Sequence, residues 1–239
     1  MAKPTLIFAI IDTVLRIILG YMQKDVWKIK TWKYYVIVPY ASVFGILGSK
    51  VASYIAYGKF EGVRMYGTVL GVAIAIAILP FILKIPFKDL YGFSAVDIWF
   101  SIAVMKIPCI IQGCCYGRDL FINSAGEAVR FPSQIVEAAL AFLIFIWFYR
   151  LGRTKYPKGA MYPLAMVYYG IFRYAADWMR GHPLEQSPFV LWIPAGRFFC
   201  ILILIIGLVS LYLVLKKAYG KRFTKKIYMK SLIGKNEMA

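Results

Sequence analysis

Long apolar segments alternate with short polar stretches along most of this chain. A run of about 20 apolar residues is long enough to cross the hydrocarbon core of a bilayer as one helix. The pattern therefore predicts an all-α, polytopic membrane protein with about seven transmembrane helices. The predicted spans cover residues 5–22, 34–57, 66–84, 94–115, 134–150, 159–178 and 188–216.

The first predicted span can be interpreted in two ways. Asp12 and Arg16 stand at i and i+4, so their side chains lie one above the other on a helix and can pair. Such a pair fits an amphipathic helix at the membrane interface as well as it fits a full span. Elsewhere the sequence shows no linker, no shift in composition and no repeat of fixed period. We therefore expect a single transmembrane domain over residues 1–239, in which residues 217–239 form a basic cytoplasmic tail.

The net charge of +18 follows the predicted topology. Of the 29 Lys and Arg residues, 18 lie on one set of alternating loops and in the C-terminal tail. Such alternation is typical of the positive-inside rule, which places the heavily basic loops in the cytoplasm. The distribution predicts a cytoplasmic C-terminus, an N-terminus outside and no nucleic-acid partner.

The stretch Lys106–Arg118, with the sequence KIPCIIQGCCYGR, interrupts the apolar pattern. A charge at membrane depth costs about 2.5–3.5 kcal/mol on insertion scales, so a retained lysine indicates a function. Pro108 frees a backbone carbonyl one turn earlier, near Lys106. Cys114 or Cys115 could instead act as a nucleophile if nearby cations activate the thiol. The cysteine spacing lacks a tetrahedral set of ligands, and we expect neither a metal nor a cofactor.

A second polar stretch lies on the sixth predicted span. Tyr169, Arg173 and Asp177 are spaced four residues apart, so they share one helix face. Arg173 and Asp177 can simply neutralise each other, but the planar guanidinium also matches a pair of phosphate oxygens. Arg197 lies similarly deep in the last predicted span. Together these residues predict a site for an anionic headgroup near one end of the bundle.

Two further segments carry weaker signals. Gln134 and Glu137 are one turn apart in PSQIVE, a sequence that ordinary helix initiation largely explains. In MYGTVLG, the spacing of Gly67 and Gly71 is typical of close helix packing, and Tyr66 could anchor the helix at the interface.

The order of these motifs supports a family assignment. GCCYGR at a helix end, PSQIVE at the next helix start and YGIFRYAADWMRG near the end resemble the prolipoprotein diacylglyceryl transferase family. MYGTVLG is similar to the corresponding region of that family, and the resemblance covers roughly residues 34–216. It implies a multi-pass protein of the bacterial cytoplasmic (inner) membrane. The implied reaction transfers a diacylglyceryl group from phosphatidylglycerol to the lipobox cysteine of a membrane-anchored preprolipoprotein and releases glycerol phosphate.

The resemblance also assigns roles to residues. Arg173 matches the essential arginine of the YGxxR element, and Asp177 stands where glutamate is usual. Gly113 and Gly117 match signature glycines. Lys106 replaces an arginine, and it lacks the bidentate geometry of a guanidinium.

The third predicted span departs from the family sequence, and this leaves the identity of the proton acceptor open. Tyr66 replaces a histidine of the family, which leaves Asp177, Glu137 and Tyr66 as candidates, the last if adjacent cations favour its phenolate. These departures keep two alternatives open: a transferase with the same anionic donor but a sugar, glycopolymer or lipid acceptor, or a non-catalytic lipid-binding accessory protein.

The predicted site residues follow from the residue patterns and from the family resemblance together. The expected catalytic residues are Arg173, Lys106, Tyr66 and Asp177. The expected substrate-binding residues are Tyr169, Gly113, Cys114, Gly117, Arg118, Gln134, Glu137 and Arg197.

Overall fold

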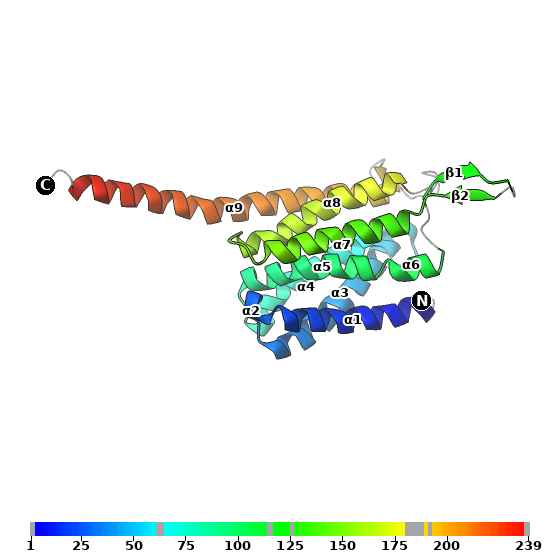
Figure 1. The fold of residues 1–239 in the computed structure, drawn as a ribbon, viewed down its shortest axis with the longest axis horizontal. Helices are drawn as coiled ribbons and strands as arrows, with labels where there is room; N and C mark the ends of the chain where they lie inside the picture. Colours follow the sequence, from blue (N-terminus) through cyan, green and yellow to red (C-terminus); the bar gives the residue numbers. More distant parts are fainter. Residues whose placement is uncertain are drawn as a thin grey trace.

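The computed structural model of the protein is a bundle of long helices that run side by side (Figure 1). It describes residues 3–60, 65–113, 117–124, 127–179, 189–190 and 193–236. The helices are α1 (Lys3–Met22), α2 (Lys24–Trp27), α3 (Thr31–Tyr57), α4 (Met65–Leu83), α5 (Phe87–Val104), α6 (Ile107–Ile111), α7 (Ser133–Leu151), α8 (Met161–Met179) and α9 (Ala195–Asn236), with a 3₁₀ turn η1 at Lys158–Ala160.

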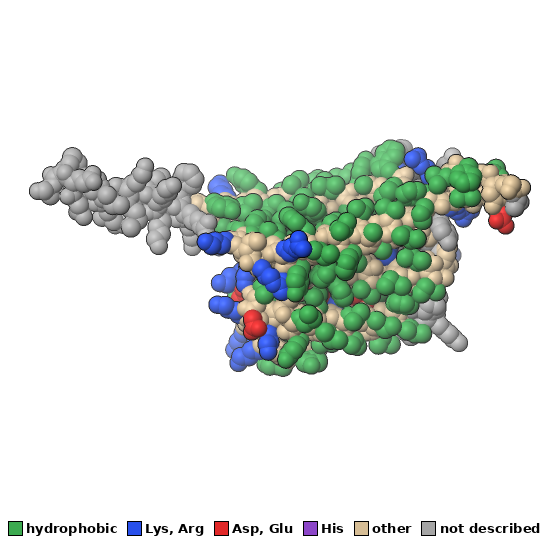
Figure 2. Space-filling view, viewed as in Figure 1, with side chains coloured by type: hydrophobic (Ala, Val, Ile, Leu, Met, Phe, Trp, Pro, Cys, Tyr) green, Lys and Arg blue, Asp and Glu red, His purple; other side chains and the backbone are tan. Residues whose placement is uncertain are grey.

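Among the described residues, five helical segments are long and apolar enough to cross a membrane. They cover Thr31–Ala56, Tyr66–Leu83, Phe87–Ile111, Ser133–Leu151 and Gly196–Gly220. Apolar side chains cover the flank of the bundle, as lipid contact requires (Figure 2). Helices α1 and α8, which carry the polar positions Asp12, Arg16, Arg173 and Asp177, lie in the same bundle. The fold is therefore a helical membrane bundle, while the count of seven spans stays a prediction.

Two predicted boundaries are wrong. The fourth span begins at Phe87 instead of residue 94, because Pro86 precedes the helix and the buried Asp89 occupies its first turn, where a carboxylate is favourable. The seventh begins at Ala195 instead of residue 188, because the short strands β3 (Phe189–Val190) and β4 (Ile193–Pro194) precede it. Helix α9 then continues past the bundle (Figure 1).

The all-α prediction also missed two antiparallel hairpins. Besides β3–β4, strands β1 (Asp119–Ile122) and β2 (Ala128–Arg130) pair and project beyond the helix ends (Figure 1). Polar and glycine residues around both hairpins obscured their short strand pattern in the sequence.

The helical path breaks at Lys106, between α5 and α6. Pro108 occupies the first turn of α6 and cannot donate to a carbonyl of α5. The backbone N–H of Lys106 instead bonds Ala103 O at 3.3 Å, in a tightened turn. This break, expected from the sequence, fixes the backbone from which the Lys106 side chain enters the bundle.

Close packing of α3 and α4 depends on glycine. A methyl group added at Gly71 would collide with the carbonyl oxygen of Phe44. One added at Gly48 would collide with the backbone of Gly67 and Gly71. The predicted small-residue packing motif is thus present, and it lets the two backbones approach closely.

We expect Gly71→Ala to lower the free energy of unfolding by about 1–3 kcal/mol, because the added methyl group must push two helix backbones apart. Unfolding of the detergent-solubilised protein measures the change. Ile74→Val, on an exposed position of the same helix, is the matched control and should change stability by less than about 0.5 kcal/mol. Equal stability of the two variants would contradict the packing role.

A buried network of hydrogen bonds and ion pairs joins helix α1 to its neighbours. Arg16 donates from Nε to Asp97 Oδ1 at 2.8 Å and from Nη2 to Asp97 Oδ2 at 2.5 Å. It also donates to Ser42 Oγ at 3.0 Å and pairs with Asp12 Oδ2 at 3.5 Å, which confirms the predicted i, i+4 pair. Ser101 donates to the same Asp12 oxygen at 2.9 Å. Because a bidentate arginine–carboxylate pair fixes geometry, the network sets how α1 lies against α3 and α5.

Lys and Arg side chains gather at the end of the bundle opposite the β1–β2 hairpin (Figure 2). The loops and helix ends there carry Lys28, Lys33, Lys84, Lys88 and Arg153, among others. The bundle therefore has one strongly basic end.

Candidate active site

Five charged side chains form a continuous cluster at the end of the bundle that bears the β1–β2 hairpin. Lys106 Nζ pairs with Glu137 Oε2, and Arg173 Nη1 lies 4.0 Å from the same oxygen. Arg173 Nη2 lies 3.7 Å from Asp177 Oδ1, and Arg197 Nε lies 3.4 Å from Asp177 Oδ2. This arrangement, which we call the charge chain, joins the α5–α6 junction, α7, α8 and α9 through alternating cations and carboxylates.

The local helix structure positions each side chain of the charge chain. Lys106 enters from the break before Pro108, and Glu137 lies in the second turn of α7, which begins at Ser133. Arg173 and Asp177 are one turn apart on α8. Arg197 lies in the first turn of α9, and its guanidinium sits 4.4 Å from the ring centroid of Trp178.

Exposure increases from Glu137 through Arg173 to Asp177. The side chain of Glu137 is 1% exposed, that of Arg173 is 13% exposed and that of Asp177 is 25% exposed. Coulomb interactions strengthen as water is excluded, so the Glu137 end is the more strongly coupled one. The Asp177 end is where a ligand can enter.

The charge chain contains more positive than negative side chains. Three cations, Lys106, Arg173 and Arg197, share two carboxylates. Within the described residues, neither Arg173 Nη1 nor Arg197 Nε has a hydrogen-bond partner, although both atoms are buried. A buried donor without an acceptor is costly. An anionic group at this position would accept these N–H groups and balance the extra positive charge.

Three other predicted site residues are buried near the same elements. Tyr66 stacks on Phe199 of α9, with ring centroids 4.6 Å apart and an interplanar angle of 4°. Tyr169 precedes Arg173 by one turn of α8 and packs against Trp99, with centroids 6.5 Å apart. Gln134 is buried in the first turn of α7. The structure therefore places Tyr66 against the helix that supplies Arg197.

The predicted glycine turn attaches the β1–β2 hairpin to α8. Gly117 N–H donates to Phe131 O at 2.7 Å, and Arg118 N–H donates to Met179 O at 3.2 Å. A methyl group added at Gly117 would come within 2.7 Å of Met179 O, so only glycine permits this approach. The Arg118 side chain is exposed, and the structure does not bring it into the charge chain.

Gly113 and Cys114 are the other predicted site residues of this stretch. Gly113 ends α6 with a positive φ of 58°, a backbone conformation that favours glycine. Cys114 and Cys115 lie outside the described residues.

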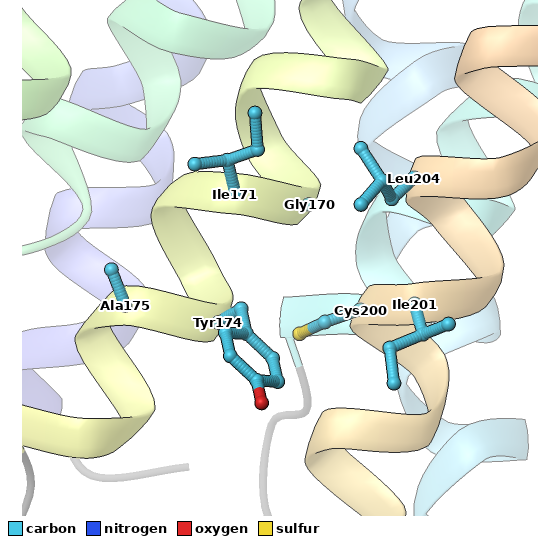
Figure 3. Close-up of a pocket in the computed structure, with 7 residues that line it drawn as sticks. All are labelled: Gly170, Ile171, Tyr174, Ala175, Cys200, Ile201 and Leu204. Carbon is cyan, nitrogen blue, oxygen red and sulfur yellow. The ribbon is translucent and has the colours of Figure 1, made fainter.

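An apolar groove opens beside the charge chain, between α8 and α9 (Figure 3). It has a volume of about 200 Å³ and is lined by Gly170, Ile171, Tyr174, Ala175, Cys200, Ile201 and Leu204. At Gly170 the two helices nearly touch, since an added methyl group would lie 2.8 Å from Leu204 Cβ. One of its lining residues, Tyr174, follows Arg173 in the sequence, and its apolar lining suits a hydrocarbon chain.

Comparison with known proteins identifies the family of the chain. The family profile described as Prolipoprotein diacylglyceryl transferase matches residues 5–213. The chain belongs to this family. A relative from Methylococcus capsulatus, named phosphatidylglycerol–prolipoprotein diacylglyceryl transferase, is 27% identical over 74% of this chain and 61% of its own length. Proteins of the same name from Teredinibacter turnerae and Aliivibrio salmonicida are 28% identical over 67% and 65% of this chain and 59% and 58% of their own lengths.

This member of the prolipoprotein diacylglyceryl transferase family therefore spans about six tenths of the length of the relatives it matches. Its family match covers the whole charge chain. In the part of the chain that the structure describes, no three His, Cys, Asp or Glu side chains are placed to hold a metal ion.

Sequence reasoning found the Arg173–Asp177 pair within α8 but not the site pairs that join different helices. The bond between Lys106 and Glu137, and the bridge from Asp177 to Arg197, join helices that are distant in the sequence. A buried acidic residue and a buried basic residue on separate apolar helices were the available signals, but they do not identify a partner.

Proposed function

We propose that the protein is a membrane transferase that moves a diacylglyceryl group from phosphatidylglycerol to the cysteine thiol of a preprolipoprotein. The observation that carries this proposal is the excess of buried cations in the charge chain, next to an apolar groove. An anionic headgroup and a hydrocarbon chain are the two parts of a phospholipid such as phosphatidylglycerol. The names of the relatives contain phosphatidylglycerol and prolipoprotein, which agree with this donor and this acceptor.

The reaction requires stabilisation of the departing phosphate. The thiolate sulfur attacks the glycerol carbon that carries the phosphate ester, a C–S bond forms, and the C–O bond to phosphate breaks. The electron pair of that bond leaves with glycerol phosphate, whose charge Arg173 and Arg197 are placed to stabilise with their N–H groups. Lys106 supports the site from the buried end through Glu137.

We assign the phenolate form of Tyr66 as the base that takes the thiol proton and becomes the neutral phenol, because Tyr66 holds the position of a family histidine and lies against the helix of Arg197. Tyr66→Phe keeps the ring that stacks on Phe199 but removes the hydroxyl. We expect transfer to fall by about 10²-fold or more with little change in KM, measured with a lipobox peptide. Undiminished transfer by Tyr66→Phe would assign the residue to packing and leave Asp177 and Glu137 as candidates.

The distribution of basic residues supports a defined orientation. The strongly basic end belongs in the cytoplasm by the positive-inside rule, so the charge chain and the β1–β2 hairpin face outward. The N-terminus of α1 lies at that outer end and the C-terminus of α9 extends from the inner one (Figure 1). We infer a multi-pass protein of the bacterial cytoplasmic membrane whose site opens to the outer leaflet.

The test is incubation of the purified protein with labelled phosphatidylglycerol and a peptide that carries a lipobox cysteine. We expect lipidated peptide and glycerol phosphate in equal amounts. Consumption of the lipid without lipidated peptide would point to a sugar, glycopolymer or lipid acceptor. If neither product forms, the transferase proposal is overturned in favour of a lipid-binding accessory role.

A further inference from the structure

The β1–β2 hairpin exposes an unusual run of apolar side chains. Leu120, Phe121 and Ile122 follow one another on β1 and are 53%, 60% and 72% exposed. Apolar residues on the flanks of the long helices are expected to contact lipid. The hairpin instead projects along the bundle axis, past the helix ends (Figure 1), and we infer that it lies outside the hydrocarbon core, which a helix of about 20 residues spans. Contiguous apolar surface in water indicates an interaction site.

The hairpin also offers backbone groups for pairing. It is a two-stranded sheet within the described residues, so each strand there has an edge with no neighbouring strand. Such an edge can accept an extended peptide through main-chain hydrogen bonds, while exposed side chains provide contact area. A lone hairpin is marginally stable, and an added strand would stabilise it.

The attachment of the hairpin decides which peptide fits. Its base is bonded to α8 through Arg118 N–H and Met179 O, two residues beyond Asp177 of the charge chain. A chain that pairs along the hairpin therefore leads directly to the outer end of the site. We propose that the β1–β2 hairpin binds the extended stretch of acceptor polypeptide next to the reactive cysteine, by adding it as a strand. This inference rests on the proposed function, since it assumes a polypeptide acceptor.

The first test is photo-crosslinking in the full-length protein. A photoreactive amino acid replaces Phe121, and Leu143 of α7, which is also 60% exposed, is the matched control position. The probe is a lipobox peptide made with and without the residues that follow the cysteine. We expect the peptide with these residues to crosslink at position 121 and not at 143. Crosslinks at 121 to lipid alone, to a second copy of the chain, or to nothing would overturn the inference.

The second test is kinetic. The double variant Phe121→Ser, Ile122→Ser should raise KM for the longer peptide by about tenfold, because only the longer peptide reaches the hairpin. For the shorter peptide, both kcat and KM should be unchanged. Equal KM values for variant and unmodified protein would overturn the inference while transfer itself persists. If the unmodified protein lipidates neither peptide, the proposed function fails. Crosslinking at position 121 then decides separately whether the hairpin binds the peptide.

Discussion

Arg173→Ala is expected to reduce diacylglyceryl transfer by about 10²–10³-fold, because in the proposed mechanism it removes N–H donors that stabilise the departing phosphate. The side chain is 13% exposed and lies between Glu137 and Asp177. Measuring lipidated peptide and released glycerol phosphate separates loss of catalysis from a change in acceptor.

Two matched variants define what the Arg173 result means. Arg173→Lys keeps the charge but loses the planar fork, so we expect it to recover only part of the rate. Arg153→Ala removes an exposed arginine at the opposite end of the bundle, where its guanidinium lies 3.7 Å from the Tyr149 ring centroid, and should leave transfer unchanged. Full activity of Arg173→Ala would refute the site.

Glu137→Ala is expected to destabilise the protein by about 3–5 kcal/mol, because it leaves two buried cations without the carboxylate they share. Lys106 Nζ pairs with Glu137 Oε2, and Arg173 Nη1 lies 4.0 Å from that oxygen. Unfolding of the protein in a fixed detergent measures the loss. Asp119→Asn breaks an ion pair with Arg130 that is more than half exposed, and it should cost only about 0–1 kcal/mol.

A double variant tests the mechanism of that loss. Glu137→Gln alone keeps the shape but removes the charge, and should destabilise for the same reason. Adding Lys106→Met removes one of the two cations that lose this carboxylate, so the double variant should be more stable than Glu137→Gln. A double variant that is no more stable than the single one would show that Lys106 and Glu137 do not depend on each other.

The two largest effects therefore test separate properties of the charge chain. Arg173 lies where the chain becomes exposed, and its loss should be seen in catalysis. Glu137 lies at the buried end, and its loss should be seen first in stability. This division follows from burial, since an uncompensated charge costs more where water is excluded.

Features that depend on residues close together in the chain could be predicted from the sequence. The apolar runs gave the helical membrane bundle, and the i, i+4 spacings gave the Asp12–Arg16 and Arg173–Asp177 pairs. Pro108 gave the helix break at Lys106. In each case helix geometry alone fixes which side chains or backbone groups meet.

Only the tertiary structure decided which distant residues meet. Arg16 and Asp97 are 81 positions apart, and Lys106 and Glu137 are 31 apart. These pairs form because helix packing brings their faces together, and many pairings would satisfy the same sequence. The hairpin on α8 likewise depends on the close approach of Gly117 to Met179. The sequence determined the membrane bundle and the charged residues it buries, and packing decided how those charges combine into one site.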